Sequence, residues 1–420
     1  MANSLTSVEQ IAWEYSCEAF ESMNVFANNT EIFKPDSGYA ELAGQTIRVP
    51  YANQLETSTG LDISGSHSDV IDLTVPLSMT SSHIKNSSFQ LNVQEALVER
   101  RITDNVKAAV RRLGSLINTS IADKIIDEGA LCAGETTALT DFDDFATAGT
   151  MLDEVEAYAM DKCLFLPPRI SQGLSNQLGM RQTDNNRDHK AYEYGELPSI
   201  NEFKTYKSNS VKQIAAENVT TVTVNGANQD VDPKAYDSDA TLTQPDVDDI
   251  RYQTLTVTNT SGSLTNGDIF SIAGVNRVGI DSKTDTGELM TFRVISGGGT
   301  TTVTISPAIV ASGPYQNVSA IPANGAAITA HNTVAATPAV FMTKDAVSLF
   351  CSDLNWGQLE NSANVVLDTY TTSSGIQVAF IRQGDAETGL VTYRFTTWTN
   401  PNIKDPLKCG VLLPSQSAAF

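Results

Sequence analysis

The hydrophobic positions between residues 95 and 128 predict one long amphipathic helix. Charged side chains occupy the opposite face of this segment, as expected for a helix with one buried side. The apolar residues recur three or four positions apart and are Val98, Ile102, Val106, Ala109, Leu113, Leu116, Ile117, Ile121 and Ile125. At about 1.5 Å per residue the helix would be on the order of 50 Å long. This exceeds what most small domains can cover and predicts a spine along an elongated subunit.

Shorter patterns flank this helix. Apolar positions from Val8 to Ala19 predict a first helix, and Thr46–Tyr51 reads as a strand stopped by Pro50. Residues 52–82 are polar at first, and from Val70 to Met79 apolar and polar side chains alternate. This pattern predicts a two-stranded extension away from the body of the protein, here called the excursion, which needs another surface to lie against. Beyond the long helix, Met151–Cys163 is helical by pattern, and Leu164–Leu166 reads as a short buried strand.

The character of the chain changes near Lys204. From there to about Thr333 it is rich in Thr, Val and Ile with frequent turn signals, which predicts an antiparallel β-barrel or sandwich. Asn225-Gly226 and Gly297–Gly299 are the predicted hairpin turns. Helix is then expected at Lys344–Leu354. The last strands are expected at 365–367, 377–382 and 390–398, so a β module interrupts an α/β body.

Composition and charge narrow the function. The formal net charge of −22 argues against nucleic-acid binding as the main activity, because phosphates would be repelled on average. No apolar run is long enough to span a membrane, and the first residues do not resemble a signal peptide. The five cysteines are widely spaced, which predicts buried reduced thiols rather than a disulfide scaffold or a zinc site.

Catalytic patterns are missing from the sequence. The four histidines are scattered, and no metalloprotease, nucleophile-elbow or phosphate-loop motif occurs. The acidic group Asp141–Asp144 is interpreted as a helix start or solvated loop rather than a calcium loop. We therefore predict no catalytic residue, no cofactor and no metal. Two alternatives remain: a hydrolase built around His189 with Asp184 or Asp188, and a secreted or surface β-rich adhesin.

The order of elements resembles a known family. The strand and loop "TIRVPYANQLETSTGLDISG", the helix "ALVERRITDNVKAAVRRLGSLINTSIADKII", the β segments "GDIFSIAGVNRVG" and "FRVISGGGTTTVTISPAIV" and the ending "GDAETGLVTYRFTTWTNPNIKDPLKCGVLLP" carry it. Together they are similar to the major capsid (coat) proteins of tailed bacteriophages, and most of all to those of short-tailed enterobacterial phages with an inserted β-barrel.

The resemblance implies an α+β fold, namely the tailed-phage major capsid fold with an inserted antiparallel β-barrel. The implied parts are an N-terminal arm (1–45), an extended loop with the first peripheral strands (46–94), a spine helix of the peripheral domain (95–130), a first axial part (131–203), the inserted barrel (204–335) and an axial and peripheral return (336–420). The implied function is structural: self-assembly into hexamers and pentamers of an icosahedral head. The implied partners are a scaffolding protein, the portal protein and packaged double-stranded DNA on the inner face, without a membrane. Assembly in the host bacterial cytoplasm and a place in the virion capsid are expected.

Two charged clusters are the candidate intersubunit contacts. The resemblance carries the role of an acidic bridging loop to Asp246, Asp248 and Asp249, and a solubilising surface loop is the alternative. A basic cluster on the long helix consists of Arg100, Arg101, Lys107, Arg111 and Arg112. It is either an ordinary salt-bridged helix face or a contact for an acidic partner, whether a subunit, a scaffolding protein or DNA.

Overall fold

A computed structural model describes residues 7–34, 46–57, 59–61, 70–96, 98–157, 161–180, 199–237, 241–352, 365–385 and 387–420. The chain forms two compact units and crosses between them several times. The first unit comprises Met1–Ile47, Leu77–Ile121 and Ser348–Asn402, and the second comprises Arg48–Pro76, Ala122–Val347 and Ile403–Phe420. Three short 3-10 helices, Ala27–Asn29, Ser81–His83 and Pro406–Lys408, lie in the connections.

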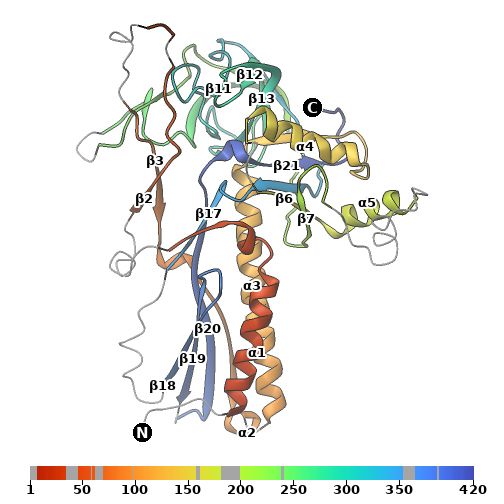
Figure 1. Cartoon of the computed structure of the whole chain (residues 1–420), viewed down its shortest axis with the longest axis vertical. Helices are drawn as coiled ribbons and strands as arrows, with labels where there is room; N and C mark the ends of the chain where they lie inside the picture. Colours follow the sequence, from red (N-terminus) through yellow and green to blue (C-terminus); the bar gives the residue numbers. More distant parts are fainter. Residues whose placement is uncertain are drawn as a thin grey trace. The chain divides into compact units, whose positions relative to one another are not determined.

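Two helices pack side by side in the first unit (Figure 1). The predicted long helix is confirmed as α3 (Glu99–Glu128), preceded by the short α2 (Val93–Ala96), and the first helix as α1 (Ser7–Met23). The two helices approach closely at Gly114 of α3, where a Cβ would lie 3.3 Å from Asn24 Oδ1 and 3.5 Å from the Phe20 ring. Asn118 donates from Nδ2 to the Met23 carbonyl at 2.7 Å and so holds the end of α1.

A six-stranded sheet completes the first unit. Its order is β1 (Glu31–Phe33), β17 (Val347–Cys351), β20 (Leu390–Ile403), β19 (Gln377–Asp385) and β18 (Val365–Thr371), and β4 (Ile84–Asn92) also pairs with β20. Trp13 of α1 packs against Phe380 at 5.6 Å and Phe395 at 5.7 Å, measured between ring centroids. The last three predicted strands are confirmed as β18, β19 and β20.

The helix predicted at Lys344–Leu354 is wrong. This segment contains β17, which runs parallel to β1 with Leu349 opposite Ile32. All five residues of β17 are buried. A strand that is buried on both faces has a continuous apolar sequence, and its periodicity does not distinguish it from a buried helix.

The body of the second unit is a five-stranded sheet with two helices. Its order is β5 (Leu131–Gly134), β21 (Cys409–Leu413), β16 (Ala339–Thr343), β6 (Lys162–Leu166) and β7 (Lys204–Lys207), and the helices are α4 (Phe142–Glu154) and α5 (Pro168–Met180). The strand predicted at Leu164–Leu166 is confirmed within β6. The helix predicted at Met151–Cys163 is wrong in its bounds, because an Asp141/Asp144 capping box starts α4 earlier and Cys163 lies in β6.

The inserted segment forms a closed barrel, as expected (Figure 1). Its strands, in order around the barrel, are β11 (Gln253–Gly262), β14 (Thr302–Ser306), β13 (Asp285–Ser296), β12 (Ile269–Val278), β15 (Ala327–Ala330) and β8 (Val219–Val224). Gly297 and its neighbours connect β13 to β14 as the predicted hairpin. Closure leaves no free edge strand on this module.

The hairpin predicted at Asn225-Gly226 is wrong. Gly226 does turn the chain with a φ of +110°. However, β8 pairs with β11 and β15, and β11 begins only at Gln253. The intervening chain forms a long loop that contains the two-residue strands β9 (Asp232–Pro233) and β10 (Asp246–Val247). A turn signal fixes the local backbone but not the strand that follows.

The predicted excursion near residues 52–82 begins and ends in a two-stranded sheet of β2 (Thr46–Pro50) and β3 (Thr74–Ser78). Tyr51 continues the pairing by donating its N–H to the Leu73 carbonyl at 2.9 Å. Residues 58 and 62–69 of the excursion lie outside the described part of the chain.

Candidate functional site

The acidic loop, residues 229–249, is the first candidate contact surface. It leaves the barrel after β8 and returns to it at β11. Two backbone hydrogen bonds join β9 and β10, from the Asp232 N–H to the Pro245 carbonyl at 2.7 Å and from the Lys234 N–H to the Val247 carbonyl at 2.8 Å. Lys234 also forms an ion pair with Asp232 at 3.2 Å. The loop therefore has a short ordered base.

Asp248 is engaged within the chain. Its Oδ2 lies 2.7 Å from Nη1 of Arg48, which belongs to β2 and is 200 residues away in sequence. The same Nη1 donates to Thr74 Oγ1 at 3.1 Å. The Arg48 guanidinium also lies 3.3 Å from the centroid of the Tyr236 ring, which is a close cation–π contact. Arg48 thus joins the start of the excursion to two points of the acidic loop.

Asp249 is also engaged within the chain. Arg251 donates to both of its oxygens, from Nε to Oδ1 at 2.9 Å and from Nη2 to Oδ2 at 2.7 Å. Arg251 is only 3% exposed and further donates to the Ile403 carbonyl at 3.0 Å. Burial alone would lower the pKa of Arg251, but the Asp249 carboxylate outweighs it and the net pKa is raised. This pair anchors the end of the loop where the barrel resumes.

Asp246 differs from the other two aspartates. It is half-buried, and its carboxylate has no hydrogen bond or ion pair with the residues that the structure describes. The three predicted contact residues therefore divide into two that are paired within the chain and one that is not. No local pattern predicts this division, because the partner of Asp248 lies in a distant segment.

The basic face of α3 is the second candidate surface. Arg100 is 90% exposed and lies 3.5 Å from Asp104, and Arg101 pairs with Glu95 at 2.6 Å. Lys107, Arg111 and Arg112 are exposed and form no ion pair within the described segments. Exposed pairs of this kind contribute at most about 1 kcal/mol each to folding. The five residues thus lie on one solvated helix, and three of them have charge available for a partner.

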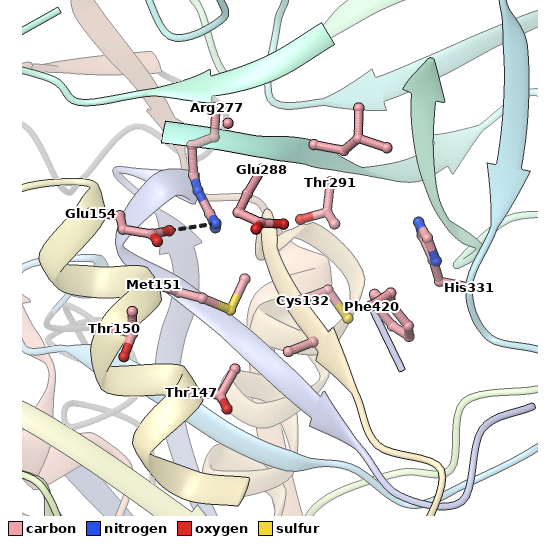
Figure 2. A pocket seen from close by; sticks show the side chains of 13 residues that line it. Cys132, Thr147, Thr150, Met151, Glu154, Arg277, Glu288, Thr291, His331 and Phe420 are labelled. Atoms are coloured by element: carbon pink, nitrogen blue, oxygen red, sulfur yellow. Dashed lines mark hydrogen bonds and ion pairs between the residues drawn. The ribbon is translucent and has the colours of Figure 1, made fainter. Parts of the chain in front are cut away.

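A cleft of about 370 Å³ lies in the second unit between α4 and the barrel (Figure 2). Arg277 of β12 pairs with Glu154 of α4 at 2.6 Å at one end of it. At the other end His331 stacks on Phe420 with ring centroids 4.1 Å apart, and its Nε2 lies 2.9 Å from Ser271 Oγ. Burial raises the pKa of the Cys132 thiol in this cleft to about 12, so it stays protonated and is no nucleophile. Ser271 is only 1% exposed and does not line the cleft, so its hydroxyl is not accessible from it.

The half-buried His331 makes unfolding pH-dependent. Burial lowers the pKa of His331 from 6.5 to about 4. The unfolded chain then binds a proton more readily than the folded chain, so stability falls as pH drops from about 6.5 towards 4. We expect a loss on the order of 1–2 kcal/mol between pH 7 and pH 5, measured by urea unfolding. His331→Gln, which cannot titrate, should show a correspondingly smaller loss, and an equal loss in both proteins would contradict the assignment.

The remaining candidates give no site. The described part of the chain contains no cluster of three His, Cys, Asp or Glu residues able to hold a metal. His189, Asp184 and Asp188 of the hydrolase alternative lie outside the described residues. None of the described helices is long and apolar enough to cross a membrane.

The described residues thus form an α+β body with an inserted closed barrel, and its two candidate contact surfaces are the acidic loop and the basic face of α3. A family model described as P22 coat protein, gene protein 5, matches residues 1–415. The chain belongs to this family. It is a major capsid protein of a bacteriophage, a component of the virion capsid that associates with itself, and not an enzyme. The predicted family is confirmed, and the adhesin alternative is not favoured.

Solved structures of phage capsids are also similar to this chain. The CUS-3 coat protein I-domain is 42% identical, covers 27% of this chain and 96% of its own, and gives a TM-score of 0.21. A structure from Mycobacterium phage Che8 is 11% identical over 92% of this chain and 90% of its own, with a TM-score of 0.44. The mature capsid of bacteriophage PhiM1 is 9% identical over 92% and 86%, with a TM-score of 0.40.

Proposed function

We propose that the chain forms the hexamers and pentamers of an icosahedral head that encloses double-stranded DNA. Its partners are a scaffolding protein during assembly, the portal protein, and the packaged DNA on the inner face. Membership of the P22 coat protein family supports the proposal. In this proposal residues 1–45 are an arm, 46–94 an extended loop, 95–130 the spine helix, 204–335 the inserted barrel, and 131–203 with 336–420 the axial and peripheral parts.

The observation that carries the proposal is the basic face of α3. The chain has a net charge of −22, so identical subunits repel one another on average. Lys107, Arg111 and Arg112 are exposed on one helix and lack ion pairs within the described residues. Such a local cation cluster offsets the repulsion where it meets an acidic partner, and complementary charge selects partner and register. We infer that the face contacts an acidic surface of a neighbouring subunit or of the scaffolding protein.

The acidic loop supplies the opposite charge. We infer that Asp246, Asp248 and Asp249 lie at a contact between neighbouring capsomers, where Asp246 is the carboxylate available to a basic side chain of another subunit, and Asp248 and Asp249 hold the loop through Arg48 and Arg251 of their own chain. Many modest contacts of this kind add up under the symmetry of a closed shell, so none needs to be strong by itself.

Assembly can be tested directly. The full chain is expressed with and without its scaffolding protein and examined by sedimentation and negative-stain electron microscopy. The expected products are closed shells with scaffolding protein, and open sheets or irregular shells without it. A stable monomer or small oligomer under both conditions would contradict the proposal.

The basic face has its own test. The double variant Arg111→Glu with Arg112→Glu should fold normally, because both side chains are exposed, and should fail to form closed shells. We expect the subunit concentration needed for assembly to rise at least about tenfold, since like charges then face the acidic partner. The control is Lys204→Glu with Lys344→Glu, which makes the same change in net charge at exposed positions of the second unit. If the α3 variant forms normal shells at the same subunit concentration as the control, the basic face of α3 is not an assembly contact.

A further inference from the structure

We infer that Arg48 is the positioning residue of the acidic loop, fixing it to the base of the excursion within each subunit. The inference rests on the proposed function of the loop as an intersubunit contact. It adds a residue that does not itself meet the partner. Arg48 determines the position in which the loop is presented to the partner.

The contacts of Arg48 are suited to this role. A single guanidinium lies against Asp248 at 2.7 Å, Thr74 at 3.1 Å and the Tyr236 ring at 3.3 Å from its centroid. Tyr236 precedes β10 and Asp248 follows it, so Arg48 holds the loop on both sides of Asp246. The planar group can stack on a ring and donate in its own plane at the same time, which a lysine ammonium cannot do.

At its start the loop is held to neighbouring segments, because Gln229 Nε2 donates to the Thr256 carbonyl at 3.1 Å and the Val231 N–H donates to the Ile309 carbonyl at 2.9 Å. Its ordered base consists of the two-residue strands β9 and β10, and its end is anchored by the Arg251–Asp249 pair. From outside the barrel, Arg48 of β2 contacts the loop at Tyr236 and at Asp248. The side chains of Arg48 and Asp248 are 28% and 27% exposed, so the pair is screened only in part.

The position of Arg48 couples two proposed contact elements. It lies in β2, immediately before the excursion, while its partners Tyr236 and Asp248 lie in the inserted segment. A neighbouring subunit that displaces the excursion therefore also displaces the acidic loop, because Arg48 connects the two. Asp248 is held within the chain for as long as the Arg48 pair is formed.

The test measures the loop in the unassembled subunit. Hydrogen exchange is followed at the Asp232 and Lys234 amides, which are bonded to Pro245 and Val247 in the loop base. We expect Arg48→Gln to raise exchange there about tenfold, and Arg48→Lys about threefold, because the lysine keeps the charge but loses the stacking. Unchanged exchange in Arg48→Gln would overturn the inference, whatever the assembly results.

Matched variants separate stacking and pairing from general damage. Tyr236→Phe keeps the ring and should behave as the parent, whereas Tyr236→Ala should loosen the loop. Arg48→Gln combined with Asp248→Asn should exchange no faster than Arg48→Gln alone, since the two residues act as one pair. Additive effects in the double variant would overturn the pairing. Lys204→Gln, which removes the 2.9 Å exposed pair with Asp161, should leave the loop amides unchanged.

Assembly of the same variants distinguishes this inference from the proposed function. If Arg48→Gln loosens the loop and raises the assembly threshold, both are supported. If it loosens the loop and shells form at the parent's threshold, Arg48 still positions the loop, and the proposed contact role of the loop is wrong.

Discussion

An Arg293→Ala variant will unfold with a free energy lower by about 3–5 kcal/mol than the parent chain. Arg293 belongs to β13 and is fully buried at 0% exposed. It donates from Nε to the Gly129 carbonyl at 3.2 Å and from Nη1 to the Gly267 carbonyl at 3.3 Å. Removing it leaves the buried Gly129 carbonyl and the half-buried Gly267 carbonyl without these donors, and it leaves a cavity of several methylene groups.

The effect should be large because the barrel caps α3. The last carbonyls of a helix lack intrahelical partners and must be satisfied elsewhere. At Glu128, the last residue of α3, the donor is Ser306, and at Gly129 and Ala130, which directly follow the helix, the donors are Arg293 and Thr291; all three donors come from β13 and β14. A cation there also suits the helix dipole, although burial lowers the pKa of Arg293. Arg293 therefore links the barrel to the end of α3, together with Ser306 and Thr291.

Urea unfolding followed by circular dichroism measures the change in Arg293→Ala. The matched control is Arg169→Ala, at an exposed position of α5, which should change stability by less than about 0.5 kcal/mol. Arg293→Met keeps most of the volume and should lose about 1–3 kcal/mol, which separates the hydrogen bonds from the cavity. A loss below 1 kcal/mol in Arg293→Ala would contradict the capping role.

Gly410→Ala is expected to be at least as damaging, with a loss above about 3 kcal/mol. Gly410 lies in β21 opposite Leu131 of β5. A Cβ at this position would be 1.9 Å from the Leu131 carbonyl oxygen and 2.6 Å from its carbon. Both are backbone atoms, so no side chain can move aside and the two strands must separate.

The control for Gly410→Ala is Gly384→Ala in β19, where a Cβ would meet nothing within 4 Å. We compare the soluble yield of both variants and the unfolding midpoint of whatever is soluble. Gly384→Ala should match the parent chain, and Gly410→Ala should be mostly insoluble or melt much earlier. Equal yields and midpoints would show that β5 and β21 adjust without cost.

Periodicity was informative wherever one face of an element is buried and the other solvated. It located α3 to within a few residues, and α1, β18, β19 and β20 with it. It failed where burial is complete, as in β17, because a continuous apolar run has no period to detect. It also misplaced α4, whose start is set by the Asp141/Asp144 capping box.

The sequence by itself therefore determined the long helix, the inserted β module and the family, because these depend on local pattern and on the order of elements. It also identified both charged clusters. The tertiary structure alone decided what those charges do. In the folded chain Arg48 pairs with Asp248, 200 residues away, and Arg251 pairs with Asp249. Lys107, Arg111 and Arg112 remain exposed without an ion pair among the described residues. Ion pairs between distant segments depend on how the chain returns to itself, and no local spacing encodes that return.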